Sequence, residues 1–200
     1  ARGMKRSQGH YAGAKTLDEI TRLCYKKGIR IVTFYAFSTE NWRRPAEEVA
    51  ALTNILTEYL KKMIGYFEEG SDEIYTHTRV RFIGDTSVFS LVQRGMIDKI
   101  ASVSKKSEPK MEMNIAVNYG GRAEIVNAVN SFIKEHKGKK ISEKDICERI
   151  YTAGQPDPDL IIRPSGEYRL SNFLLWQAAY SEFMFTDTLW PDFTPEEFEK

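Results

Sequence analysis

The stretch that decides the fold is GIRIVTFYAF, residues 28–37, in which β-branched and aromatic side chains dominate. A short run of this kind, bounded by polar segments, is typical of a buried strand. The preceding residues 11–27 place their apolar side chains on one face of a helix. After the strand, Pro45 suits the first position of a second helix. Helix, strand and helix in this order predict an α/β unit.

The same alternation continues to the end of the chain. Further helices are expected at 45–69, 91–106, 122–136, 142–152 and 172–182, and further strands at 79–85, 111–120, 159–166 and 182–187. Repeated alternation predicts a mostly parallel central sheet flanked by helices. Because no repeat or low-complexity linker interrupts the pattern, we expect a single domain over residues 1–200.

The composition narrows the class of protein. Lys and Arg number 29 and Asp and Glu 28, so the formal charge of +1 argues against a nucleic-acid partner. Hydrophobic residues make up 42% of the chain and charged residues 28%, as in an ordinary soluble protein. Cys24 and Cys147 lie far apart, and no apolar run approaches the length of a membrane span. These features predict a cytoplasmic protein without structural disulfides.

Four polar segments follow the predicted strands, at residues 38–45, 84–87, 118–122 and 163–169. In sheets of this type, ligands bind beyond the carboxyl ends of the strands. We therefore expect the four segments to converge on one rim of the sheet. The glycines of NYGGR, residues 118–122, are a weak phosphate-binding signal, and close packing explains them equally well.

The segment RPSGEYRLS, residues 163–171, combines two arginines with a turn and directly precedes the apolar run NFLLW. Guanidinium groups match phosphate oxygens bidentately and stay charged at any working pH. Ser171 and Asn172 stand where an N-cap would expose the amides of a following helix to an anion. The segment thus suits an anion that carries a hydrocarbon tail. In the alternative interpretation, it is a turn in which Glu167 pairs with one arginine.

The segment STENWRR, residues 38–44, gathers polar and aromatic groups after the first strand. Ser38, Asn41 and Arg44 could address an anion or a reacting C–H group, and Trp42 could border an apolar chain. In the alternative interpretation, Asn41 makes a turn and Trp42 belongs to the core.

Arg6 and His10 stand just before the first predicted helix, where they could bind a phosphate, and Glu182 could be a metal ligand. The sequence lacks the glycine-rich nucleotide loops, the GxSxG nucleophile elbow and the HExxH zinc motif. No competing constellation therefore suggests a different chemistry.

Several strings together resemble one family. FYAFSTENWRRP, VRFIGD, NYGGR, RPSGEYRLSNFLLWQ and EFMFTDTLWPDF occur in this order and at similar spacings in the cis-prenyltransferases, most closely in the bacterial undecaprenyl diphosphate synthase type. The resemblance runs from about residue 6 to residue 193.

This resemblance implies an enzyme that condenses isopentenyl diphosphate in cis onto an allylic starter such as farnesyl diphosphate. The implied product is a long polyprenyl (undecaprenyl) diphosphate for the cell-wall carrier lipid. It further implies Mg²⁺ as cofactor, a homodimer, an apolar tunnel lined by the helix after Pro45, and peripheral contact with the inner face of the membrane for product release.

The resemblance also assigns roles to single residues. It places the isopentenyl diphosphate on Arg163, Arg169, Leu170 and Ser171, and the Mg²⁺ ion on Glu182. It predicts that Arg6 and His10 contact the allylic diphosphate. Further substrate contacts fall to Ser38, Thr39, Glu40, Trp42 and Arg44, and proton removal from the isopentenyl unit to Asn41.

Two elements of the family pattern are expected outside the chain. The signature Asp-Gly-Asn-Gly-Arg-Trp, which carries the principal Mg²⁺ ligand, would precede Ala1, and an Arg/Gly-rich tail would follow Lys200. We expect truncation or disorder rather than natural loss. The absent aspartate leaves one alternative, a non-catalytic partner subunit of a cis-prenyltransferase complex. Tyr168 also stands where some bacterial members have histidine, so it is not counted as a ligand.

Overall fold

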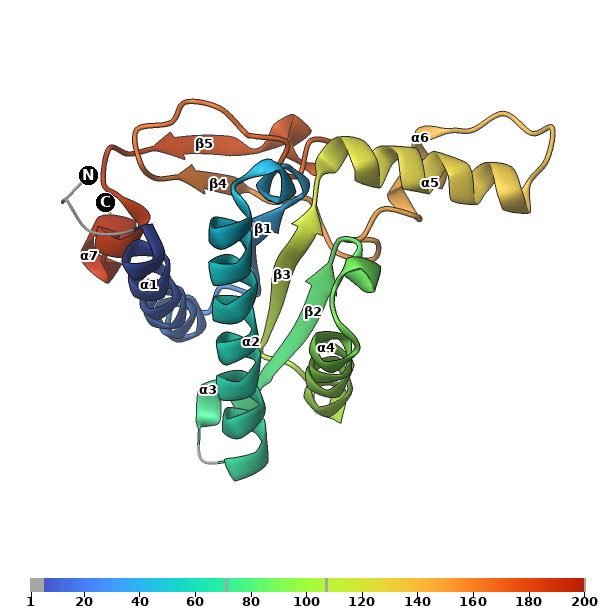
Figure 1. Cartoon of the computed structure of the whole chain (residues 1–200). Coiled ribbons are helices and arrows are strands. Elements are labelled where there is room, and N and C mark those ends of the chain that lie inside the picture. The colour runs from blue at the N-terminus through green and yellow to red at the C-terminus, as the bar shows by residue number, and fades with distance from the viewer. Residues whose placement is uncertain (1–5, 71, 107, 200) are drawn as a thin grey trace.

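The computed structural model describes residues 6–70, 72–106 and 108–199. Helices and strands alternate along the chain, as predicted (Figure 1). The helices are α1 Arg6–Lys26, α2 Ala46–Glu69, α3 Glu73–Thr76, α4 Leu91–Val103, α5 Gly121–Glu135, α6 Glu143–Cys147 and α7 Pro195–Phe198. The strands are β1 Ile31–Ser38, β2 Thr78–Ile83, β3 Met111–Tyr119, β4 Leu160–Arg163 and β5 Glu182–Phe185.

All the strand pairs of the described residues are parallel, which confirms the predicted α/β class. The strands form two sheets, a larger one in the order β1-β3-β2 and a smaller one of β4 and β5. Ile115 at the middle of β3 is paired with Phe34 on one side and Phe82 on the other. The carboxyl ends of β1, β2 and β3 therefore reach the same rim.

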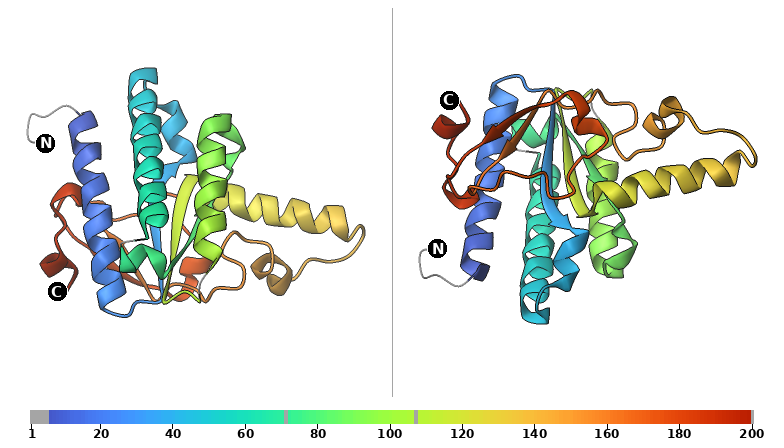
Figure 2. Two further views of the ribbon diagram at one scale, coloured as in Figure 1. Left: turned by 90° about the horizontal axis from the view of Figure 1, so that it is seen from below. Right: turned by 90° about the horizontal axis from the view of Figure 1, so that it is seen from above.

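Helices α1, α2 and α4 cover one face of the larger sheet, as both views of Figure 2 show. Helix α5 leaves the rim at the end of β3 and extends away from the sheet, with α6 beside it (Figure 1). The strand β3 is buried along nearly its whole length. A strand covered on both faces requires apolar side chains in both directions, which explains why MEMNIAVNY shows no simple alternation.

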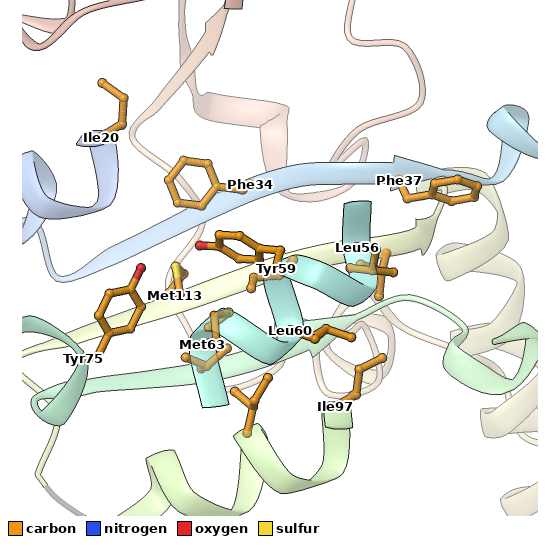
Figure 3. Packing of buried hydrophobic residues seen from close by; sticks show 14 of the residues in the cluster. Ile20, Phe34, Phe37, Leu56, Tyr59, Leu60, Met63, Tyr75, Ile97 and Met113 are labelled. Carbon is orange, nitrogen blue, oxygen red and sulfur yellow. The ribbon is translucent and has the colours of Figure 1, made fainter. Parts of the chain in front are cut away.

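The main core lies between the larger sheet and these helices, where side chains of β1, β3, α2 and α4 point toward one another (Figure 3). Leu60 and Met63 of α2 and Met113 of β3 are fully buried. Burial of each such side chain stabilises the fold by about 1.5–3 kcal/mol. The apolar stripe of α2 is thus part of the core, and its role as the wall of a substrate tunnel stays a prediction.

Two predicted helices are shorter or absent. The helix expected at 142–152 ends at Cys147, and the backbone N–H of Tyr151 instead donates to the buried carboxylate of Glu124, at 2.8 Å. The helix expected at 172–182 is replaced by a turn and a short 3₁₀ helix, Gln177–Tyr180. Asn172 and Leu174 have φ angles of 65° and 43°, which no right-handed helix accommodates.

Within the described part of the chain, none of the helices is both long enough and apolar enough to pass through a bilayer. Cys24 is buried and Cys147 is exposed, and both are free thiols.

Candidate anion site at the rim of the sheet

Three of the predicted polar segments meet at the rim through one side chain, Asn118 at the end of β3. The indole Nε1 of Trp42 donates to Asn118 Oδ1 at 2.8 Å, and Asn118 Nδ2 donates to the carbonyl oxygen of Asp85 at 2.9 Å. Asn118 has a φ of 46°, a conformation that asparagine tolerates better than most residues. The predicted convergence of these segments is confirmed.

The segment after β1 forms a 3₁₀ turn, Thr39–Arg43. Asn41 Oδ1 accepts a hydrogen bond of 2.7 Å from the backbone N–H of Ser38, so Asn41 does shape a turn. Trp42 is 39% exposed and packs its ring against Phe37, with a centroid distance of 5.0 Å. Trp42 therefore contacts the core at the rim and also presents part of its surface to solvent.

The segment Arg163–Asn172, which we call the arginine arch, leads away from the end of β4. Gly166 has a φ of 64°, which supports the prediction that this turn needs a glycine. Its backbone N–H donates to Thr186 O at 2.9 Å, which holds the arch against the residues after β5. Glu167 forms an ion pair with Arg169, as the alternative interpretation of this segment expected.

Tyr35 joins the arch to the sheet, and the sequence analysis did not single it out. Its hydroxyl lies 3.2 Å from Tyr119 O and 3.4 Å from Ser171 O, and its ring stacks on Phe173 at a centroid distance of 4.6 Å. Burial, together with the negative charge of Glu40, raises the pKa of Tyr35 to about 12. The hydroxyl is therefore a neutral donor. Its position three residues before Ser38 was the only sequence signal.

Asn172 joins the arch to two other parts of the rim. Its carbonyl oxygen accepts from Gly121 N at 2.7 Å, and its Oδ1 accepts from Arg122 N at 2.9 Å. Its Nδ2 donates to Glu40 Oε1 at 2.9 Å. The prediction that residues 171 and 172 cap a following helix is wrong, because Asn172 caps α5 instead. The first two amides of α5, those of Gly121 and Arg122, are thus bonded to protein and not left open for a phosphate.

The glycines of NYGGR are a packing device. A Cβ on Gly120 would lie 2.7 Å from both Asn172 Nδ2 and Thr39 Oγ1. A Cβ on Gly121 would lie 2.9 Å from the side chain of Leu175. Of the two explanations left open by the sequence, close approach of the arch is the one that the structure supports.

A buried carboxylate, Glu124, lies in the first turn of α5, and no sequence motif singled it out. It is 1% exposed and accepts hydrogen bonds from the hydroxyl of Tyr119 and from Gln177 Nε2, the latter at 3.2 Å. Together with its bond to Tyr151 N, these contacts hold β3, the turn after α6 and the end of the apolar run together. Glu124 therefore stabilises the junction of these three segments through contacts with protein groups.

The other predicted site residues lie near the start of α2, at the end of β4 and at the start of α1. Arg44 pairs with Glu48 at 2.6 Å, on the exposed first turn of α2. Arg163 ends β4 and is half-buried, and the electrostatic environment of Tyr35 includes its positive charge. Arg6 and His10 lie in the first turns of α1, and their side chains fall outside the described part of the structure.

Glu182 begins β5 and is exposed. It pairs in the sheet with Leu160, whereas Arg163 pairs with Phe185. Glu182 and Arg163 thus lie at opposite ends of the small sheet, about 10 Å apart along the strands at the usual rise per residue. Among the described residues, no three His, Cys, Asp or Glu side chains gather in a way that could hold a metal.

This donor set fits a Mg²⁺ ion that arrives bound to a diphosphate, because Mg²⁺ commonly takes one or two carboxylates and completes its shell with substrate phosphates and water. It does not fit a metal held by the described residues of one chain alone.

The comparisons with known proteins agree with this geometry. The family model described as "Putative undecaprenyl diphosphate synthase" matches residues 1–200. An isoprenyl transferase of Clostridium perfringens is 47% identical over 205 residues, which cover 100% of this chain and 78% of the relative. An isoprenyl transferase of Aquifex aeolicus is 42% identical, with 100% and 83% covered.

Two solved structures share the fold. The "probable undecaprenyl diphosphate synthase" from Campylobacter jejuni has a TM-score of 0.81 and 32% identity, covering 94% of this chain and 85% of its own. Lavandulyl diphosphate synthase from Lavandula x intermedia, in complex with dimethylallyl diphosphate, has a TM-score of 0.89 and 30% identity, covering 99% and 85%. The chain belongs to the cis-prenyltransferase family of isoprenyl transferases.

Proposed function

We propose that the protein condenses isopentenyl diphosphate repeatedly, with cis geometry, onto an allylic diphosphate, with farnesyl diphosphate as the starter and a long polyprenyl (undecaprenyl) diphosphate for cell-wall carrier lipid as the product. The main support is the joining of the arginine arch to the turn after β1. Asn172 bonds Glu40, and Tyr35 bonds the backbone of Ser171. Two predicted substrate segments thereby lie on one rim.

The proposed reaction requires positively charged side chains and hydrogen-bond donors at the same rim. Ionisation of an allylic diphosphate places growing negative charge on the leaving group, which preorganised cations and amides stabilise. We assign the isopentenyl diphosphate to Arg163, Arg169, Leu170 and Ser171. Fixing it beside the allylic carbon converts an encounter into an intramolecular step.

The turn after β1 completes the site in this proposal. Ser38, Thr39, Glu40, Trp42 and Arg44 contact substrate, and Asn41 assists removal of the proton from the isopentenyl unit. Arg6 and His10 are proposed to contact the allylic diphosphate from the start of α1. In this proposal the hydrocarbon chain enters a tunnel lined by α2, from which water must be excluded if the allylic cation is to survive.

The ion pair of Arg169 fits exchange for substrate. Arg169 pairs with Glu167, and the Arg169 side chain is 65% exposed. An exposed ion pair contributes only about 0–1 kcal/mol, so a diphosphate replaces the Glu167 carboxylate at small cost. Arg44 pairs with Glu48, whose side chain is only 11% exposed, so this pair is held more firmly. The Arg169 guanidinium is therefore available to an incoming anion.

We propose Mg²⁺ as the counterion of the diphosphates, with Glu182 as a protein ligand. When bound, the ion would neutralise charge on the departing pyrophosphate.

The surface supports a homodimer. Phe183 and Phe185 of β5 are 44% and 36% exposed, and Val126 and Ile133 of α5 are 56% and 55% exposed. The rings of Phe183 and Phe185 stack on each other, and exposed apolar groups of this kind are found at interaction sites. We place the enzyme in the cytoplasm, with peripheral contact at the inner face of the membrane, because a polyprenyl product partitions into lipid.

Incubation of the full-length protein with farnesyl diphosphate, labelled isopentenyl diphosphate and Mg²⁺ tests the activity. We expect Mg²⁺-dependent growth of the labelled chain, with cis double bonds and a length that is read by chromatography. If the wild-type protein forms no elongated product with any allylic starter, the proposed function is wrong.

The substitution Glu182→Ala tests the metal assignment. We expect the Mg²⁺ concentration for half-maximal rate to rise about tenfold, because one oxygen ligand is lost from a shell otherwise made of phosphate and water. Rate measured against Mg²⁺ concentration at saturating substrates gives this value. The exposed Glu199 provides a control, and Glu199→Ala should leave the Mg²⁺ dependence unchanged. An unchanged dependence in Glu182→Ala would remove Glu182 from the metal site.

A further inference from the structure

One residue, Asn172, connects three segments that are far apart in the sequence, through its backbone carbonyl and its side-chain amide. It bonds the start of α5 through Gly121 N and Arg122 N, and it bonds the turn after β1 through Glu40. It directly follows Ser171 in the arginine arch. Both side-chain groups, Oδ1 and Nδ2, are bonded to protein, so Asn172 itself is not suited to hold a ligand.

The local backbone favours this residue type. Asn172 has a φ of 65°, in the left-handed region that asparagine and aspartate enter more readily than other non-glycine residues. Gly120 permits the approach, because a Cβ there would press on Asn172 Nδ2 and Thr39 Oγ1. Asparagine also supplies both an acceptor for α5 and a donor for Glu40, which aspartate does not at neutral pH.

The partner carboxylate is held in its charged form. Partial burial opposes ionisation of Glu40, but hydrogen bonds from Asn172, its own backbone, Thr39 and Ser38 leave its pKa lowered overall. A charged Glu40 accepts a stronger hydrogen bond than a neutral one. The Asn172–Glu40 bond therefore fixes the turn after β1 relative to the arch.

We propose that Asn172 is a positioning residue that sets the distance between the arginine arch and the turn after β1 by donating to Glu40. The inference rests on the proposed function, in which both segments bind substrate. Asn172 then acts on isopentenyl diphosphate affinity without touching the substrate, because it determines where Ser171 and the adjoining arch stand relative to Glu40.

The substitution Asn172→Asp isolates the bond to Glu40. Aspartate tolerates the same φ and keeps the oxygen that caps α5, but it replaces the donor by a second negative charge. We expect the KM for isopentenyl diphosphate to rise about tenfold at pH 8, with kcat changed less than about threefold and the melting temperature nearly unchanged.

The pH profile gives a readout that a merely structural role would not move. Two carboxylates in contact repel each other, which raises the pKa of one of them. When that carboxyl is protonated, its O–H donates to the other and restores the lost bond. The KM ratio of Asn172→Asp to wild type should therefore fall as the pH is lowered from about 8 to about 6. Tyr35, which interacts electrostatically with Glu40, stays neutral in this range because its pKa is raised to about 12.

A double-mutant cycle with Glu40→Gln distinguishes the coupling between Asn172 and Glu40 from the effect of Glu40 alone. If Asn172 acts through Glu40, Asn172→Asp should cost about tenfold in KM beside Glu40 and less than about threefold beside Gln, whose amide donates to the new aspartate. An equal cost in both backgrounds, or no cost in either, overturns the inference. A wild-type protein that makes no prenyl product overturns the proposed function instead.

A second variant guards against misfolding of the first. Gly120→Ala leaves residue 172 intact and displaces both its side chain and the hydroxyl of Thr39 by contact. We expect the same selective rise in the KM for isopentenyl diphosphate. If Asn172→Asp melts early and Gly120→Ala is stable with wild-type KM, Asn172 has no positioning role.

Discussion

Replacement of Asn41 by alanine should lower kcat about 100-fold, while the KM values for isopentenyl and farnesyl diphosphate change less than about threefold. The reason is that the proposed role of Asn41 belongs to proton removal, a step made after both substrates are bound. Steady-state rates measured with each substrate varied in turn provide these constants. This is one of the two largest effects that we expect from a single substitution.

The structure shows why a control is needed. Asn41 Oδ1 accepts from Ser38 N, so alanine also removes a bond that shapes the turn after β1. Asn41→Asp keeps an oxygen that can accept from Ser38 N, but it loses the amide donors and gains a negative charge. If Asn41→Asp is as slow as Asn41→Ala, an oxygen that shapes the turn is not sufficient, and the neutral amide is required for turnover. If it retains wild-type kcat, Asn41 is a turn residue and its assigned role is wrong.

Replacement of Arg169 by alanine should raise the KM for isopentenyl diphosphate about 100-fold and leave the affinity for farnesyl diphosphate within about threefold. A charge-assisted, bidentate bond to a phosphate contributes about 1.5–3 kcal/mol, and its loss falls on the substrate that the arch holds. Direct titration of each diphosphate by calorimetry distinguishes the two affinities. Equal losses for both substrates would contradict the assignment of the arch to the isopentenyl unit.

Glu167 provides the matched control for this prediction. Because Glu167 pairs with Arg169, the substitution Glu167→Gln removes a competitor of the diphosphate and leaves the guanidinium in place. We expect the KM for isopentenyl diphosphate to stay the same or to fall. Arg169→Lys should be intermediate, since lysine keeps the charge but loses the fork of donors.

Much of the fold was predictable because its local signals agree. Pro45 and the apolar stripe that follows it gave the long helix α2, and GIRIVTFYAF gave β1. The predicted helix at 172–182 was wrong because a run of helix-compatible residues was overridden by the left-handed φ angles of Asn172 and Leu174. Those angles follow from contacts with Gly120, Gly121 and Glu40, which lie more than fifty residues earlier in the chain.

The residues of the candidate site were likewise predictable only in part. Ordered motifs identified the family and named the arginines, the hydroxyls and Asn41. Tyr35, Glu124 and the cap formed by Asn172 were not predictable, because each acts through a partner that is remote in sequence.

By itself, the sequence determined the α/β class, the family and the chemical types of the groups at the rim, since these depend on local periodicity and on the order of short motifs. Only the tertiary structure decided that the arch caps α5, that Glu167 forms an ion pair with Arg169, and that Asn172 connects the arch to Glu40. The physical reason is that a hydrogen bond forms between whatever groups the fold brings within about 3 Å, and spacing along the chain does not record that distance.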